Sequence, residues 1–424
     1  MAPISKHLLP TNSSVDPDGA LRIAGVRIDD LAAEFGTPLF VYDEDHIRSN
    51  CRALVTEFGI DNVVYASKAF LCKAMAGLVH EEGLMLDVAS GGELFVALAA
   101  GVPANRCVLH GNNKSDRELI EAIEAGVHHI VVDSFDELAR LEAIHSTGLP
   151  VARIQLRVTP GVHVHTHEFV ATGQDDSKFG FNLNNGDAAR AVSLCTESKS
   201  VELLGLHCHI GSQVFAADNF TAAAKAMVEF FAPLGLEELT LGGGLGVAYL
   251  NNEPTPTYSQ WGSALKEATR ILPSSARVIV EPGRSLVAAT AMTVYSVGTV
   301  KNISGIRKYI SVDGGMSDNP RPIMYGSGYE AFDPMRVEAD RPDNARIVGK
   351  HCESGDIVIL DASIPANVKV GDLLVTPVTG AYGYSMASNY NKIGRPAVVF
   401  VSNGNARLVV RREEYEDLVR LDIG

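Results

Sequence analysis

The feature that most constrains the fold of this chain is a regular alternation of short apolar runs with helix-sized segments between residues 63 and 281. Runs rich in β-branched residues are typical of buried strands. Eight are expected as strands, at residues 63–67, 84–88, 107–110, 129–133, 154–158, 203–209, 238–241 and 278–281. Helical patterns separate them, for example at 92–100, 116–125, 134–145, 218–231 and 259–271. Because alternating strands and helices form parallel sheets, eight such units predict a (β/α)8 barrel rather than an open doubly wound sheet.

The sequence changes character after residue 287, where short strand patterns are separated by glycine, proline and asparagine turns. Strands are expected at 294–300, 309–312, 356–360, 372–375, 397–401 and 406–411, followed by a short helix at 413–421. Because 424 residues exceed what one hydrophobic core normally stabilises, two domains are expected. We predict an α/β chain with an N-terminal segment at 1–45, a (β/α)8 TIM barrel at 46–287 and a mainly β domain at 288–424. A strand at 38–42 is expected to join the sheet of the β domain.

The composition indicates a small substrate and a reducing compartment. A formal net charge of −15 argues against nucleic acid or an anionic membrane as the main partner. No run of about 18 apolar residues could span a bilayer, and residues 1–16 lack the apolar core of a signal peptide, so we expect a cytoplasmic protein. Six cysteines without CxxC spacing favour reduced thiols over disulfides or a zinc site, and no metal is expected.

Polar residues stand where most of the expected barrel strands end, and barrel enzymes place their reactive groups there. They are Lys68, Asp87, Ser90, His110, Asn112, Asp133, Arg157, His209, Ser212, Glu281 and Arg284. A desolvated lysine after a buried strand favours the neutral, nucleophilic amine, which makes Lys68 a candidate catalytic residue. The alternative is an ordinary solvated loop lysine.

Two glycine-containing segments follow the seventh and eighth strands. Leu-Gly-Gly-Gly-Leu-Gly at 241–246 could bind phosphate through backbone N–H groups, although a tight packing turn is the alternative. Glu281 and Arg284 could form an internal salt bridge, or could pair with a protonated ring nitrogen and a phosphate. A lysine, a phosphate site and an acid for a pyridinium are what proteins usually contribute to pyridoxal phosphate chemistry.

Further polar groups allow more than one interpretation. His207 and His209 could bind a metal, stack on a flat cofactor or fill the core, and no third ligand of equal weight favours metal. In the β domain, polar clusters at 318–322, 350–356 and 379–384 could be surface turns or could face an active site.

Six motifs together make the chain similar to the fold type III pyridoxal phosphate decarboxylases. They are Tyr-Ala-Ser-Lys-Ala at 65–69, His-Ile-Gly-Ser-Gln at 209–213, Gly-Gly-Gly-Leu-Gly at 242–246, Glu-Pro-Gly-Arg at 281–284, Cys-Glu-Ser-Gly-Asp at 352–356 and Gly-Ala-Tyr-Gly-Tyr-Ser at 380–385. Asp-Gly-Gly-Met-Ser at 313–317, Arg321-Pro and Ala-Ser-Asn-Tyr-Asn at 387–391 most resemble the members that convert meso-diaminopimelate to L-lysine. Rival activities are decarboxylation of ornithine, arginine, lysine or carboxynorspermidine, alanine racemisation, and non-catalytic cofactor binding.

The resemblance implies a homodimer with active sites at the subunit interface, and it implies a role for each matching residue. Lys68 would hold pyridoxal 5'-phosphate covalently, His209 would stack on its ring and Glu281 would pair with its ring nitrogen. The remaining cofactor-binding residues would be Ser212, Gly242, Gly243, Gly244, Gly283, Arg284 and Tyr382. The substrate would contact Arg284, Arg321, Tyr325, Glu353 and Tyr382, and Cys352 of the neighbouring subunit would donate a proton. The loop at 163–180 is expected to act as an active-site lid.

Overall fold

The computed structural model of the 424-residue chain describes residues 3–161, 174–209, 211–215 and 217–424, except for the side chains of 217–219. The chain divides into two compact units. One contains Asn50–Gly246 and Pro256–Ser285, and the other contains Met1–Ser49, Val247–Thr255 and Leu286–Gly424. Residues 247–255, which lie inside the expected barrel range, therefore belong to the second unit.

The first unit contains the expected parallel barrel. Its strands are β5 (Val64–Ala66), β6 (Met85–Val88), β7 (Cys107–Leu109), β8 (His129–Val132), β9 (Ala152–Thr159), β11 (Val201–His207), β12 (Glu238–Thr240) and β13 (Arg277–Ile279), each parallel to the next. A parallel bridge between Val63 and Val280 joins the last strand to the first. The predicted (β/α)8 barrel is thus confirmed. One short strand that the sequence analysis missed, β10 (Phe181–Asn182), pairs with β9 alone.

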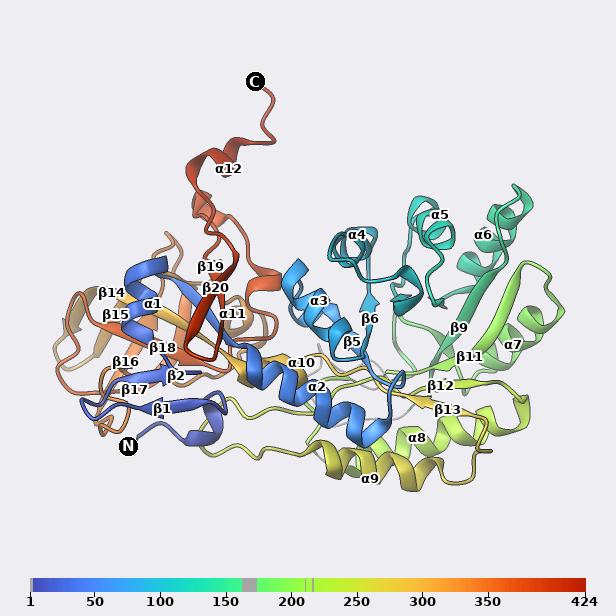
Figure 1. The fold of residues 1–424 in the computed structure, drawn as a ribbon, viewed down its shortest axis with the longest axis horizontal. Coiled ribbons are helices and arrows are strands. Elements are labelled where there is room, and N and C mark those ends of the chain that lie inside the picture. The colour runs from blue at the N-terminus through green and yellow to red at the C-terminus, as the bar shows by residue number, and fades with distance from the viewer. Residues whose placement is uncertain (1–2, 162–173, 210, 216) are drawn as a thin grey trace. The chain divides into compact units, whose positions relative to one another are not determined.

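Helices follow the barrel strands in the order that the sequence predicted (Figure 1). They are α3 (Lys73–Glu81), α4 (Gly91–Ala99), α5 (Asp116–Ala125), α6 (Phe135–Ser146), α7 (Asp187–Glu197), α8 (Ala217–Phe231), α9 (Tyr258–Thr269) and the short α10 (Arg284–Val287). The hydroxyls of Ser90, Ser115, Ser134 and Thr257 cap α4, α5, α6 and α9 by accepting from backbone N–H groups of the first turn. These caps explain why the helices begin directly after the loops at the strand ends.

The second unit is built on an eight-stranded sheet in the order β17-β16-β15-β14-β4-β19-β20, with β18 paired to β14. The strands are β4 (Leu39–Asp43), β14 (Ala291–Ile303), β15 (Arg307–Val312), β16 (Asp343–Val348), β17 (Ile357–Ile364), β18 (Leu373–Pro377), β19 (Ala397–Ser402) and β20 (Asn405–Val410). The N-terminal strand β4 lies between β14 and β19. It is completely buried, which explains its unbroken apolar sequence Leu-Phe-Val-Tyr.

Smaller elements complete this unit. They are β1 (Ser13–Val15), β2 (Leu21–Ile23) and β3 (Val26–Arg27), which form a separate three-stranded sheet, and helices α1 (Ile28–Phe35), α11 (Arg321–Tyr325) and α12 (Tyr415–Val419). Helix α2 (Glu44–Phe58) begins in this unit and ends in the barrel unit. Among the residues that the structure describes, no helix is both long and apolar enough to cross a membrane.

Candidate functional site

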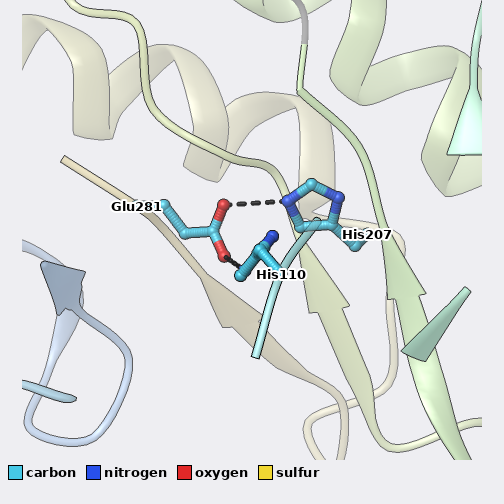
Figure 2. Close-up of side chains that lie close together, drawn as sticks. All are labelled: His110, His207 and Glu281. Carbon is cyan, nitrogen blue, oxygen red and sulfur yellow. Dashed lines mark hydrogen bonds and ion pairs between the residues drawn. The ribbon is translucent and has the colours of Figure 1, made fainter. Parts of the chain in front are cut away.

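The C-terminal ends of the barrel strands carry the polar groups that the sequence placed there. Two of these groups converge inside the barrel with His207, although the three residues come from strands β7, β11 and β13 or directly follow them, and these strands are not neighbours in the sheet. The three residues are His110, His207 and Glu281, and their side chains point toward one another (Figure 2). Residues distant in sequence therefore form one buried cluster at the predicted mouth of the barrel.

One histidine lies next to each carboxylate oxygen of Glu281. His207 Nε2 donates to Oε2 at 2.8 Å, and His110 Nε2 lies 3.0 Å from Oε1. The two imidazoles are also in edge-to-face contact, with ring centroids 5.0 Å apart. His207 is 1% exposed, and His110 and Glu281 are each 7% exposed, so these polar contacts are shielded from bulk water.

This arrangement keeps the carboxylate ionised despite its burial. Burial by itself would raise the pKa of Glu281, but the attraction and hydrogen bonds of His207 and His110 prevail and hold that pKa well below its ordinary value. Burial lowers the pKa of His207, so its imidazole is neutral at physiological pH. The barrel mouth consequently contains a buried negative charge that is held by a hydrogen bond from His207 and by the close contact of His110 Nε2.

Lys68 lies in the short 3-10 turn η2 (Ser67–Ala69) directly after β5. Its side chain is exposed, so the desolvation expected from the sequence is not found; the turn carries the side chain past the buried end of the strand. Burial and then the positive charge of Lys68 lower the pKa of His209 well below the ordinary value. The imidazole of His209 is therefore neutral at physiological pH, which suits stacking on a flat ring.

The triple glycine after β12 allows three loops to approach closely. A Cβ atom at Gly243 would lie 2.0 Å from the carbonyl oxygen of Glu281, and one at Gly244 would lie 2.2 Å from that of Gly211. Gly242 has a left-handed φ of 62°, and its carbonyl accepts the N–H of Glu281 at 2.7 Å. The packing interpretation of these glycines is thus correct, and the same packing places their backbone beside Glu281. Gly283 is also buried against Ala66.

Arg284 supplies a buried cation next to this loop. Its Nε and Nη2 donate to the Ser212 hydroxyl oxygen at 3.1 and 3.0 Å. Since that oxygen accepts both bonds, the hydroxyl proton can point to another acceptor. A guanidinium and a hydroxyl held together in this way suit a phosphate group.

The barrel side chains as a set fit pyridoxal phosphate. The aldehyde of this compound matches the exposed amine of Lys68, and its ring face matches the neutral imidazole of His209. Its ring nitrogen matches the buried carboxylate of Glu281, and its phosphate matches the pair of Arg284 and Ser212. The residues that could hold it are Lys68, His209, Glu281, Arg284 and Ser212, and the glycines at 242–244.

The second unit contains the other predicted site residues, among them Arg321. This arginine is 4% exposed and lies over the ring of Tyr249, with Cζ 4.2 Å from the centroid, and it donates to the hydroxyl of Tyr329. In the described part of the chain no carboxylate pairs with it, and its Nε has no hydrogen-bond partner. Tyr249 and Tyr329 were not identified from the sequence, because their importance depends on contact with Arg321.

Cys352 and Glu353 are exposed in the turn between β16 and β17. The backbone N–H of Cys352 donates to Asn391 Oδ1 at 3.1 Å. The buried Asp356 accepts the N–H of His351 at 2.8 Å and that of Met316 at 2.7 Å. The turn that carries the predicted proton donor is thus anchored at both ends.

Tyr325 is half-buried at the end of α11, and Tyr382 has a left-handed φ of 58° in the loop before the 3-10 turn η7 (Tyr384–Met386). Residues 163–173 of the predicted lid lie outside the described residues. Its described end includes Gly180, whose N–H donates to Asp133 Oδ2 at 3.0 Å.

A second cluster of ionisable groups is formed by His128, His129 and Glu238 at the opposite ends of the barrel strands. Both Glu238 oxygens already accept hydrogen bonds, one from Arg277 Nη1 and one from Gln155 Nε2, each at 2.9 Å. A guanidinium next to the carboxylate disfavours a metal ion there by charge repulsion.

Comparison with known proteins places these observations in a family. The family described as "Pyridoxal-dependent decarboxylase, pyridoxal binding domain" matches residues 44–288. Diaminopimelate decarboxylase of Mycobacterium tuberculosis H37Rv is 45% identical over 99% of this chain and 98% of its own length. The enzyme of that name from Bacillus subtilis is 47% identical over 96% of this chain and 95% of its own length. A crystal structure of diaminopimelate decarboxylase from M. jannaschii with L-lysine superposes with a TM-score of 0.90, at 33% identity and 98% coverage of both chains.

Proposed function

We propose that this chain, which belongs to the diaminopimelate decarboxylases of the pyridoxal-dependent decarboxylase family, converts meso-2,6-diaminopimelate to L-lysine and carbon dioxide. The observation that carries the substrate assignment is Arg321, a buried cation in an aromatic frame without a carboxylate partner among the described residues. Diaminopimelate has an amino and a carboxyl group at each end. An arginine is well suited to bind the carboxyl group that does not react.

Pyridoxal phosphate, when bound, supplies an electron sink for the electron pair that remains after carbon dioxide leaves. On the protein side, the Lys68 amine holds the cofactor and His209 covers one face of its ring. Glu281 accepts a hydrogen bond from the ring nitrogen, which keeps that nitrogen protonated. The phosphate is bound by Arg284, Ser212, Tyr382 and the backbone at Gly242–Gly244, and Gly283 binds the cofactor from the loop before Arg284.

The substrate is oriented by groups that match its two ends. Arg321 and Arg284 bind the unreacting carboxylate, and Tyr325 and Tyr382 add hydroxyl donors. Glu353 binds the ammonium group beside that carboxylate. Cys352 Sγ then gives its proton to the carbon atom from which carbon dioxide has left.

We propose further that the active protein is a homodimer in which Cys352 and Glu353 act in the site of the partner. The anchored turn at 349–356 supports this, because the side chains of Cys352 and Glu353 are exposed on it while His351 and Asp356 are buried. Mixing Lys68→Ala and Cys352→Ala proteins should then restore activity, at about a quarter of the wild-type sites for random reassociation of subunits. If the mixture stays as inactive as its components, the shared site is excluded.

The proposed location is the cytoplasm. None of the six cysteines, all of which lie in the described part of the chain, forms a disulfide, and Cys352 is exposed, which suits a reducing compartment.

The proposed reaction is tested by incubating purified protein with pyridoxal phosphate and meso-diaminopimelate and measuring L-lysine. We expect lysine formation and a visible absorption band from covalently bound cofactor, both lost in Lys68→Ala. Lys73→Ala, at the start of α3, is the matched control and should keep both. A wild-type protein that stays colourless with added cofactor would contradict the proposal.

A further inference from the structure

We infer that His110 and His207 are positioning residues, which hold the Glu281 carboxylate in place as the acceptor for the ring nitrogen of pyridoxal phosphate. This inference rests on the proposed function and deepens it by assigning two residues that the sequence left without this role. Figure 2 shows the arrangement: one histidine at each oxygen of a single carboxylate.

The geometry leaves Glu281 able to accept another hydrogen bond. A carboxylate offers about four lone-pair sites, and each Glu281 oxygen meets only one of these imidazole nitrogens. The two contacts restrain both oxygens of the carboxylate, and the histidines belong to separate parts of the barrel, His110 directly after β7 and His207 at the end of β11. A third donor can therefore approach a carboxylate whose direction is already set.

A histidine at position 207 also preserves the negative charge of Glu281, because it can donate a hydrogen bond while it is neutral. His207 Nδ1 is buried without a hydrogen-bond partner among the described residues, so a proton there would be an unsatisfied buried donor. His207 is therefore the neutral tautomer with its proton on Nε2. A neutral donor stabilises a carboxylate without cancelling its charge, whereas an arginine in this place would. The charge remains available to a pyridinium.

Other ionisable groups act on Glu281 through the electrostatic field of the barrel interior. They are His129, Arg157, Cys208 and His209, with Asp87 3.9 Å from His110 Nε2. Only His110 and His207 reach the carboxylate oxygens within 3.0 Å among the described side chains. The test must therefore remove their N–H groups without changing these neighbours.

The experiment compares His207→Leu and His110→Leu, which remove the donor, with His207→Gln and His110→Gln, whose amide can donate near the position of Nε2. Dissociation constants are measured for pyridoxal phosphate and for an analogue with carbon in place of the ring nitrogen. We expect the leucine variants to bind pyridoxal phosphate about tenfold to 100-fold more weakly, and the glutamine variants within about fivefold of wild type. Binding of the carbon analogue should be the same in all of them.

Activity gives a second readout. The leucine variants should lose about 100-fold in kcat while KM for meso-diaminopimelate changes less than about threefold, because the substrate does not contact these histidines. His7→Leu, an exposed histidine in the second unit, should change nothing. If a leucine variant does not fold, His207→Asn serves instead, because its shorter amide cannot reach the position of Nε2.

Equal weakening for both cofactors, or wild-type binding in the leucine variants, would overturn the inference while leaving the proposed function intact. A wild-type protein without affinity for pyridoxal phosphate would overturn the proposed function, and the inference with it.

Discussion

Arg284 donates two hydrogen bonds to the Ser212 hydroxyl, from Nε at 3.1 Å and from Nη2 at 3.0 Å. Because the oxygen accepts both, the hydroxyl proton is directed to another acceptor, which we take to be the cofactor phosphate. Ser212→Ala should weaken pyridoxal phosphate binding by about tenfold to 150-fold, since a hydrogen bond to a charged group contributes roughly 1.5–3 kcal/mol. Fluorescence titration of the apoprotein measures this. Ser263→Ala, on the exposed face of α9, is the control, and equal affinity of the two variants would count against the phosphate site.

Arg321 contacts the rings of Tyr249 and Tyr329 and has no carboxylate partner in the described part of the chain. Arg321→Gln should lower kcat/KM for meso-diaminopimelate by at least about 100-fold, because a desolvated arginine–carboxylate pair is lost. Arg321→Lys should recover little, since lysine cannot form the bidentate contact. The measurement is kcat/KM by steady-state kinetics for the Arg321 variants and for Arg420→Gln, an exposed control in the C-terminal segment. An unchanged kcat/KM in Arg321→Gln would remove Arg321 from the substrate site.

Asn391 holds the backbone of Cys352 by accepting its N–H at 3.1 Å, and Asn391 itself has a left-handed φ of 54°. Asn391→Gly keeps the backbone conformation and removes the acceptor, whereas Asn391→Asp keeps both. The glycine variant should lose about fivefold to tenfold in kcat, because one hydrogen bond contributes about 1 kcal/mol. The aspartate variant should stay close to wild type. Equal kcat values in the two variants would show that the hydrogen bond does not position the thiol.

Stability should fall with acid because His46 is buried and neutral. Thr11 N–H donates to His46 Nδ1 at 3.3 Å, and burial lowers the pKa of His46 from 6.5 to about 4. The unfolded chain therefore takes up a proton below pH 6.5 that the folded chain refuses until about pH 4. Stability is complete above the unfolded pKa and decreases through this window.

The measurement is the free energy of unfolding of wild type and His46→Asn, whose amide oxygen can accept from Thr11 but does not titrate. Between pH 7 and pH 5 wild type should lose about 2 kcal/mol more than the variant. Identical pH dependence of the two proteins would mean that His46 is not responsible.

The barrel could be predicted from the sequence because its buried strands are short, largely apolar runs that alternate with helical patterns, and all eight runs became strands. Strand β16 was missed because only Ala345 and Ile347 face the core between polar residues. Its pairing with β15 and β17 determines its conformation more than its local sequence does.

The candidate site was predictable where a residue type and its place at a strand end carry the chemistry, as for Lys68 and Glu281. The side chains that contact those residues could not be predicted. The contact of His110 and His207 with Glu281 depends on register across the barrel interior, and the frame of Tyr249 and Tyr329 around Arg321 joins segments distant in sequence. The solvent exposure of Lys68 could not be predicted either, because the turn after β5 determines where its side chain lies.

The proposed reaction is tested most directly by measuring carbon dioxide release from equal concentrations of meso-diaminopimelate, L-lysine and L-ornithine by the protein loaded with pyridoxal phosphate. We predict rapid release from meso-diaminopimelate only, because only this substrate carries a second carboxylate for Arg321. Release from L-ornithine or L-lysine with none from meso-diaminopimelate would contradict the account.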